Sequence, residues 1–167
     1  MKKGILFFLL VCFAFASCGK KDDSGKKTNI KDKLIITYTN DYQNNFAAVM
    51  TSTKDSALKS AVDFNIRHQT IPDWELKECK EKVANYPCRI IPHDDSTKEI
   101  NVFLPNNIIL LAEGDADKEM GSPEWNDIEK LKATIPEFDI DGLLKLSGDT
   151  IKGTELLKYF PKLDKKQ

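Results

Sequence analysis

The acidic residues Asp115, Asp117 and Glu119 occupy alternate positions in the densest acidic stretch of the chain. A calcium-binding loop presents carboxylate ligands at alternate positions, followed by a glycine at its sixth position and a bidentate glutamate at its twelfth. Here the glycine comes one residue late, at Gly121, and Asn126 stands in place of the glutamate. We therefore expect a solvated loop without a metal ion, with calcium binding by the three acidic residues as the alternative.

The two histidines, His68 and His93, have no second ligand at the short spacings typical of metal sites. His93 precedes Asp94 and Asp95, and aspartates favour turns because their side chains bond to the nearby backbone. The chain also lacks the Gly-x-Ser-x-Gly, glycine-rich phosphate-loop and His-Glu-x-x-His motifs. We therefore expect no catalytic residue, no cofactor and a protein that is not an enzyme, with a zinc or catalytic site at His93, Asp94 and Asp95 as the alternative.

Cys79 and Cys88 are separated by eight residues, which excludes the Cys-x-x-Cys redox motif. The first lies on the apolar side of an expected helix, and the second begins an expected strand. In an exported protein two spare cysteines favour a structural disulfide, which would join the helix end to the strand start. Two reduced, buried cysteines are the alternative.

The N-terminus has the pattern of an export signal. Lys2 and Lys3 precede an uncharged apolar run from residue 5 to residue 15. This run is shorter than the roughly 20 residues that span a bilayer, and its length suits the apolar core of a signal peptide. It ends in the small residues Ala16 and Ser17, which Cys18 follows directly.

The segment Phe15-Ala16-Ser17-Cys18 resembles the lipobox of bacterial lipoproteins. Phe15 replaces the usual leucine, a departure that resembles lipoproteins of spirochaetes or Bacteroidota. The resemblance implies that residues 1–17 are removed and that Cys18 is diacylated, for example with palmitate, and begins the mature protein. An ordinary secretory signal that is cleaved nearby is the alternative.

Charge divides the remaining chain into two parts. Residues 19–33 contain six lysines, three aspartates and no aromatic residue, so residues 18–33 are expected to form a disordered basic tether of charge +3 behind the lipid. Residues 34–167 contain 17 basic and 23 acidic residues, a charge of -6, and are expected to form a single exported domain. The whole chain, 167 residues with a net charge of -1, lacks the basic excess of a nucleic-acid-binding protein.

Two features of the tether concern the location of the protein. Gly19 follows the cysteine, so the aspartate that retains enteric lipoproteins in the inner membrane is absent. Lys21-Asp22-Asp23 resembles the export signal of surface lipoproteins in Bacteroidota. We therefore expect a protein anchored by its acyl chains in the outer membrane and exposed at the cell surface, with the periplasmic face as the alternative.

The exported domain is expected to have an α+β fold, in which a short sheet is packed by several helices. Strands are expected near residues 34–39, 88–92 and 99–104, where β-branched and aromatic residues gather. The apolar run Ile108–Ala112 is too short to assign by periodicity alone.

Helices are expected wherever apolar residues recur at helical spacing. Their apolar positions include Tyr42, Phe46, Val49 and Met50; Leu58, Ala61 and Val62; Leu76, Cys79 and Val83; and Trp125, Ile128, Leu131 and Ile135. A final pair of short helices, broken by Gly148 and Gly153, is expected to follow.

The function that fits these features is that of a non-enzymatic, adhesin-like binding protein, anchored to the outer membrane and contacting host or environmental macromolecules such as an extracellular or plasma protein. One alternative is a periplasm-facing accessory lipoprotein of an envelope or secretion assembly. A second alternative is an enzyme that uses acidic residues such as Asp115 and Asp117, with or without a metal.

Overall fold

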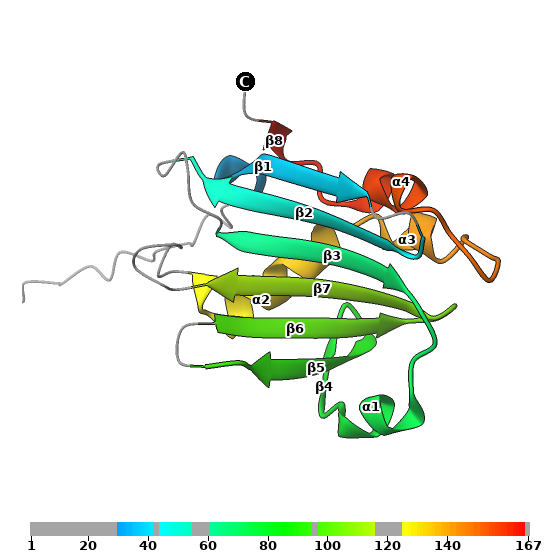
Figure 1. Cartoon of the computed structure of the whole chain (residues 1–167). Coiled ribbons are helices and arrows are strands. Elements are labelled where there is room, and N and C mark those ends of the chain that lie inside the picture. The colour runs from blue at the N-terminus through cyan, green and yellow to red at the C-terminus, as the bar shows by residue number, and fades with distance from the viewer. Residues whose placement is uncertain (1–29, 42–43, 55–60, 95–96, 116–124, 166–167) are drawn as a thin grey trace, which may run out of the picture.

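The computed structural model describes residues 30–41, 44–54, 61–94, 97–115 and 125–165. These residues form one eight-stranded sheet in the order β4-β5-β6-β7-β3-β2-β1-β8 (Figure 1). The neighbouring strands pair antiparallel, except β1 and β8, which are parallel. The strands are β1 (Leu34–Asp41), β2 (Phe46–Thr53), β3 (Val62–His68), β4 (Glu81–Val83), β5 (Tyr86–Pro92), β6 (Thr97–Leu104), β7 (Ile108–Asp115) and β8 (Asp164–Lys165).

The described helices are short. They are α1 (Asp73–Glu78), α2 (Ile128–Thr134), α3 (Ile140–Leu143) and α4 (Gly153–Leu156), with the 3-10 turns η1 (Ile30–Asp32), η3 (Ile135–Glu137) and η4 (Leu157–Tyr159). In Figure 1 the helices α2, α3 and α4 lie behind the sheet, whereas α1 lies beside the edge formed by β4 and β5. Within the described ranges, no helix has the length and apolar character needed to cross a membrane.

The expected α+β fold, a short sheet packed by several helices, is wrong, because the domain is mostly sheet. The three expected strands are present as β1, β5 and β6, but they are part of a much wider sheet. The segment of Phe46, Val49 and Met50, expected to be helical, is the strand β2. Its backbone bonds to β1 on one side and to β3 on the other, so the sheet satisfies the donors and acceptors that a helix would have satisfied internally.

The helix expected to carry Leu76, Cys79 and Val83 is also shorter than its apolar spacing indicates. The helix α1 ends at Glu78, and Val83 belongs to β4. The residues that follow Val83, Ala84 and Asn85, have φ angles of 51° and 71° and form the connection from β4 to β5. Two left-handed residues in a two-residue connection are typical of a type I′ hairpin turn. This turn pairs the residues before it, β4, with β5 as antiparallel strands, so they cannot continue the helix.

Other expectations in the second half of the domain differ in detail. The run Ile108–Ala112 lies in β7, near the centre of the sheet. Of the expected helix of Trp125, Ile128, Leu131 and Ile135, α2 contains only Ile128 and Leu131, since Trp125 precedes it and Ile135 begins η3. The Asp127 side chain caps α2 by accepting a hydrogen bond from the Glu129 amide. Gly153 begins α4 rather than breaking a helix. Tyr42 and Leu58 lie outside the described residues, and Val62, expected in one helix with Leu58, instead begins β3.

Alternate residues of the central strands face the helices and form the core. One row of direct cross-strand partners runs through Val49, Phe64, Ala112, Ile100 and Ile90. The ring of Phe64 makes an edge-to-face contact with that of Phe138, with 5.6 Å between the ring centroids. Buried residues of the segments that cover this face, among them Leu131, Ile135, Leu143, Leu156 and Phe160, belong to the same core.

The residues between these core positions form the opposite surface, which we call the outer face. In the view of Figure 1 it is the face of the sheet turned away from α2, α3 and α4. Most of its side chains are half-buried, whereas Phe103, Ile109 and Leu111 near the middle of the sheet are buried. The outer face consists of Phe46, Ala48 and Met50 of β2; Asp63, Asn65 and Arg67 of β3; Ile109, Leu111 and Glu113 of β7; Glu99, Asn101 and Phe103 of β6; and Arg89 and Ile91 of β5.

Candidate functional site

A row of acidic residues crosses one end of the outer face. Asp63 of β3 is the direct partner of Glu113 in β7, and Glu113 is the direct partner of Glu99 in β6. Like charges placed directly opposite each other in a sheet are destabilising, by up to about 1 kcal/mol for each pair. The three carboxylates also give this end of the outer face a negative charge, which attracts positively charged groups.

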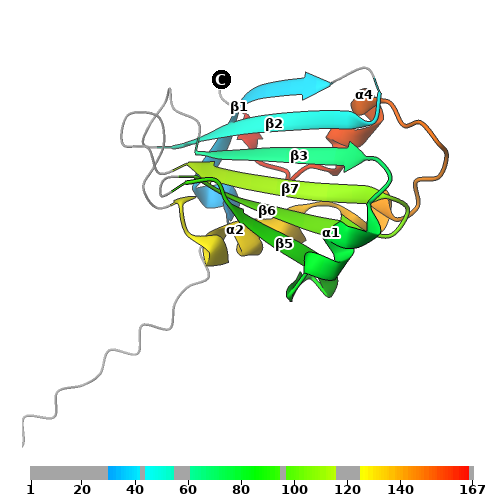
Figure 2. The ribbon, with the colours of Figure 1, turned by 60° about the horizontal axis from the view of Figure 1, so that its bottom comes forward.

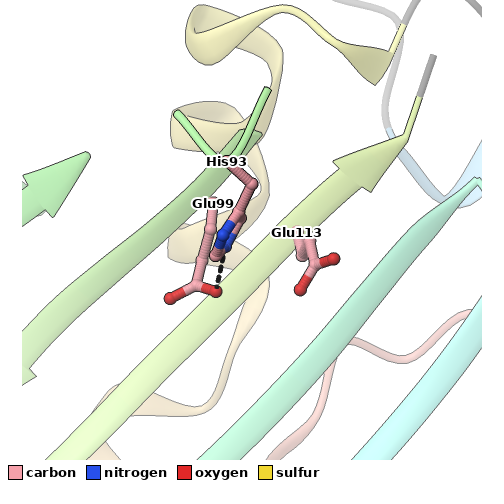
Figure 3. Close-up of side chains that lie close together, drawn as sticks. All are labelled: His93, Glu99 and Glu113. Carbon is pink, nitrogen blue, oxygen red and sulfur yellow. Dashed lines mark hydrogen bonds and ion pairs between the residues drawn. The ribbon is translucent and has the colours of Figure 1, made fainter. Parts of the chain in front are cut away.

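His93 supplies a nitrogen atom to this acidic end. The connection from β5 to β6 is closed by a hydrogen bond from the His93 amide to the Thr97 carbonyl (3.1 Å) and by one from the Thr97 amide to the Asp94 carboxylate (2.6 Å). This closure places the imidazole above β6, where its Nε2 atom lies 3.0 Å from the Oε2 atom of Glu99 (Figure 3).

Glu99 is held from two sides. Its Oε1 atom accepts a hydrogen bond from the side-chain amide of Asn101, two residues further along β6, while Oε2 faces His93. Its side chain is 13% exposed, against 46% for that of His93. The hydrogen bond to Glu99 raises the pKa of His93 above its usual 6.5, and the negative charges of Glu99, Glu113 and Asp94 act in the same direction.

One potential ligand atom from each of His93, Glu99 and Glu113 lies within 4.8 Å of the others. An imidazole nitrogen and two carboxylate oxygens form a donor set that a divalent transition-metal ion accepts. The sequence offers His93 no second ligand at the short spacing of a metal-binding motif. The structure supplies two, because strand register brings together residues that no short motif connects. An outward-facing Glu99 just after a turn would have been the only local signal.

The expected acidic loop is only partly described. Asp115 is the last residue of β7, where its backbone pairs with Thr97. Asp117 and Glu119 lie outside the described residues, and so does Cys18. The expected absence of calcium at the loop and the expected lipidation of Cys18 therefore remain predictions.

Cys79 and Cys88 are both free thiols in this structure. The Cys79 thiol, just after α1, donates to the Glu75 carbonyl (3.3 Å), and Cys88 on the core side of β5 stands opposite Glu81. Burial raises the pKa of both thiols, and in Cys88 the neighbouring Glu81 and Cys79 raise it further. The predicted disulfide stays a prediction. Cys79 comes two residues before Glu81, the direct partner of Cys88 in the sheet, so the two cysteines are close in the fold.

The other histidine, His68, ends β3 on the core side and is 8% exposed. Its Nδ1 atom lies 3.5 Å from the side-chain oxygen of Asn45, which also accepts a hydrogen bond from the Ile151 amide (2.8 Å). Both His68 and Asn45 line a polar hollow of about 300 Å³. Asn45 thus joins the start of β2 to His68 at the end of β3 and to the C-terminal segment at Ile151.

The end of the outer face opposite the acidic row combines aromatic and cationic groups. The guanidinium of Arg67 lies 5.2 Å from the centre of the Phe46 ring, directly across from it in the sheet. The Nε atom of Arg67 is buried and has no acceptor within the described part of the chain. Closer to the acidic row, Arg89 of β5 stands opposite Asn101, lies over the ring of Trp74 from α1 (5.3 Å) and pairs with Glu78 (3.1 Å). Trp74 is 53% exposed.

Comparison with protein-family models, with curated proteins and with solved structures gives no match for this chain. The candidate sites therefore rest on the geometry described above.

Proposed function

We propose that this chain is a lipid-anchored lipoprotein of the outer membrane, exposed at the cell surface, that binds an extracellular protein of the host or the environment and is not an enzyme. The resemblance of Phe15-Ala16-Ser17-Cys18 to a lipobox supports the anchor. Acyl chains on Cys18 would contribute about 0.8 kcal/mol for each buried methylene group, and more than one chain makes anchoring stable.

The observation that carries the binding role is the composition of the outer face. Phe46, Met50, Arg67 and Arg89 are half-buried on it, and Trp74 of α1 is exposed beside it. Aromatic residues, methionine and arginine are enriched in protein–protein interfaces, and tryptophan and arginine contribute many of the energetically dominant contacts.

The strands limit how much side-chain freedom a partner must remove. Phe46 and Arg67 are already held against each other, and Arg89 is held by Trp74 and Glu78. Ordering a mobile side chain on binding costs about 0.5–1.5 kcal/mol, so preordered groups favour association. The acidic row with Asp63, Glu99 and Glu113 favours a partner that presents positive charge at that end.

Display at the surface is tested on intact cells. We expect added protease to remove the domain from intact cells, and a Cys18→Ser variant to lose incorporated palmitate and to leave the membrane fraction. Protection of the domain until the cells are broken would contradict surface display and favour the periplasm-facing accessory role. Unchanged palmitate incorporation in Cys18→Ser would contradict the anchor.

Binding is tested with purified extracellular-matrix and plasma proteins presented one at a time. We expect one of them to bind at micromolar concentration or below, and we expect Phe46→Ala and Arg67→Ala to weaken that binding at least tenfold. Glu155→Gln, a change in the exposed part of α4 behind the sheet, is the matched control and is expected to bind as the unmodified protein does. Failure of the whole panel to bind, or equal binding by all variants, would contradict the proposal.

A further inference from the structure

We propose that His93, Glu99 and Glu113 form a binding site for one divalent first-row transition-metal ion of the Zn²⁺ type. This site goes beyond the proposed function, because binding of a protein partner and anchoring by lipid do not require a metal ion. It also differs from the calcium loop considered from the sequence, since it uses neither Asp117 nor Glu119.

The three ligand atoms lie almost as close together as those of a tetrahedral zinc site. With bonds of about 2.0–2.1 Å, the ligand atoms of a tetrahedral zinc site lie roughly 3.3 Å apart. The Nε2 atom of His93 and the Oε2 atom of Glu99 are already 3.0 Å apart, and all three ligand atoms lie within 4.8 Å. A bound ion would require the Glu113 carboxylate to come closer to the other two ligand atoms.

The sheet fixes the relative positions of the two carboxylates. Glu99 and Glu113 are direct partners in the antiparallel pair of β6 and β7, where opposite Cα atoms lie about 4.5–5.5 Å apart. Figure 3 shows Glu113 rising from the strand next to the one that carries Glu99, with His93 lying over Glu99. A bound cation would remove the repulsion between these two like charges.

Asn101, which is not one of the three ligands, holds the Glu99 carboxylate in place. Asn101 donates a hydrogen bond to the Oε1 atom of Glu99, which holds the carboxylate and leaves Oε2 facing His93. Carboxylates that bind metals are commonly held in this way by a neighbouring group, and loss of that group typically weakens metal binding 10–100-fold. Asn101 is therefore assigned as a positioning residue.

The donor set also indicates the class of ion. Magnesium and calcium prefer shells made of oxygen atoms, with six or more ligands, whereas imidazole favours zinc and its first-row neighbours. Three protein ligands on an accessible surface leave further positions to water or to an atom of a bound partner. The alternative is an ion pair between protonated His93 and the two carboxylates, which would bind no zinc.

The test uses the full protein, purified in detergent from the expressing cells without an affinity tag, treated with EDTA and alkylated at its thiols. Alkylation matters because cysteine thiolates are zinc ligands, so the free thiols of Cys79 and Cys88 could add binding unrelated to His93. In a calorimetric titration with Zn²⁺ we expect one saturable site, an affinity reduced at least tenfold in His93→Asn, Glu99→Gln and Glu113→Gln, and no competition from a tenfold excess of Mg²⁺.

Asn101→Ala is expected to weaken zinc binding 10–100-fold while all three ligands remain. Glu155→Gln is the matched control and is expected to bind zinc as the unmodified protein does. The circular dichroism spectrum and melting temperature of each variant without metal show whether it folds. A folded protein without saturable zinc binding, or equal binding by the ligand variants and the control, would overturn the site. Neither result would affect the surface-display or partner-binding tests.

Discussion

The Nε2 atom of His93 lies 3.0 Å from the Oε2 atom of Glu99, across the connection that joins β5 to β6. The pair stands at the acidic end of the outer face, beside Glu113. The geometry holds the imidazole against a carboxylate that Asn101 keeps in place. This contact changes the pKa of His93, which can be measured in the protein without a metal ion.

In the metal-free protein we expect the pKa of His93, followed by NMR, to lie above 6.5. Glu99→Gln removes the main cause and should lower the pKa, Glu113→Gln should lower it less, and Glu155→Gln should leave it unchanged. Because the folded-state pKa exceeds the unfolded value of about 6.5, the contribution of His93 to stability is complete below that pH. It disappears as the pH rises through the folded-state pKa. A pKa at or below 6.5 would contradict the observed pairing.

The left-handed conformation of Ala84 gives a second prediction. At a φ of 51° an L-residue bears a cost of about 1–2 kcal/mol that glycine avoids, while the greater freedom of unfolded glycine removes about 0.4–1 kcal/mol of that gain. We expect Ala84→Gly to raise the free energy of unfolding by roughly 0.5–1 kcal/mol in denaturant titrations. The matched change Ala133→Gly, on the exposed side of α2, should lower it by about 1 kcal/mol. Equal effects would argue against the turn.

Two phenylalanines distinguish the faces of the sheet. Phe64 is fully buried and contacts Phe138, whereas Phe46 is half-buried on the outer face beneath Arg67. We expect Phe64→Ala to lower the free energy of unfolding by about 3–5 kcal/mol because it leaves a cavity. Phe46→Ala should lower it by about 1–2 kcal/mol, from partial burial and the lost contact with the guanidinium. The reverse order would mean that the faces are wrongly assigned.

The cysteines give a prediction about oxidation. In protein taken from the expressing cells and unfolded before labelling, we expect Cys79 and Cys88 to take up alkylating reagent only after reduction, as located by peptide mass. Closing so short a loop should contribute roughly 2–3 kcal/mol to stability, which reduction removes. Alkylation of both residues before reduction would show that the free thiols of the structure are the state in the cell.

The sequence indicated part of the fold through local composition. The β-branched run from Leu34 to Thr37 predicted β1, and similar runs predicted β5 and β6. The segment Phe46–Thr53 misled because its apolar residues match helical spacing as well as strand alternation. The local sequence pattern of this segment carries no information about its hydrogen bonds to β1 and β3. Those bonds make the segment a strand.

The sequence by itself determined features whose chemistry is local: the lipobox-like segment before Cys18, the positive and negative parts of the chain and the absence of familiar catalytic motifs. Only the tertiary structure decided that the domain is mostly sheet and that Glu113 stands beside Glu99 and His93. The physical reason is strand register, since a shift of one residue would turn every side chain of β7 to the other face. That register is set by hydrogen bonds and burial across strands that are separated in the sequence.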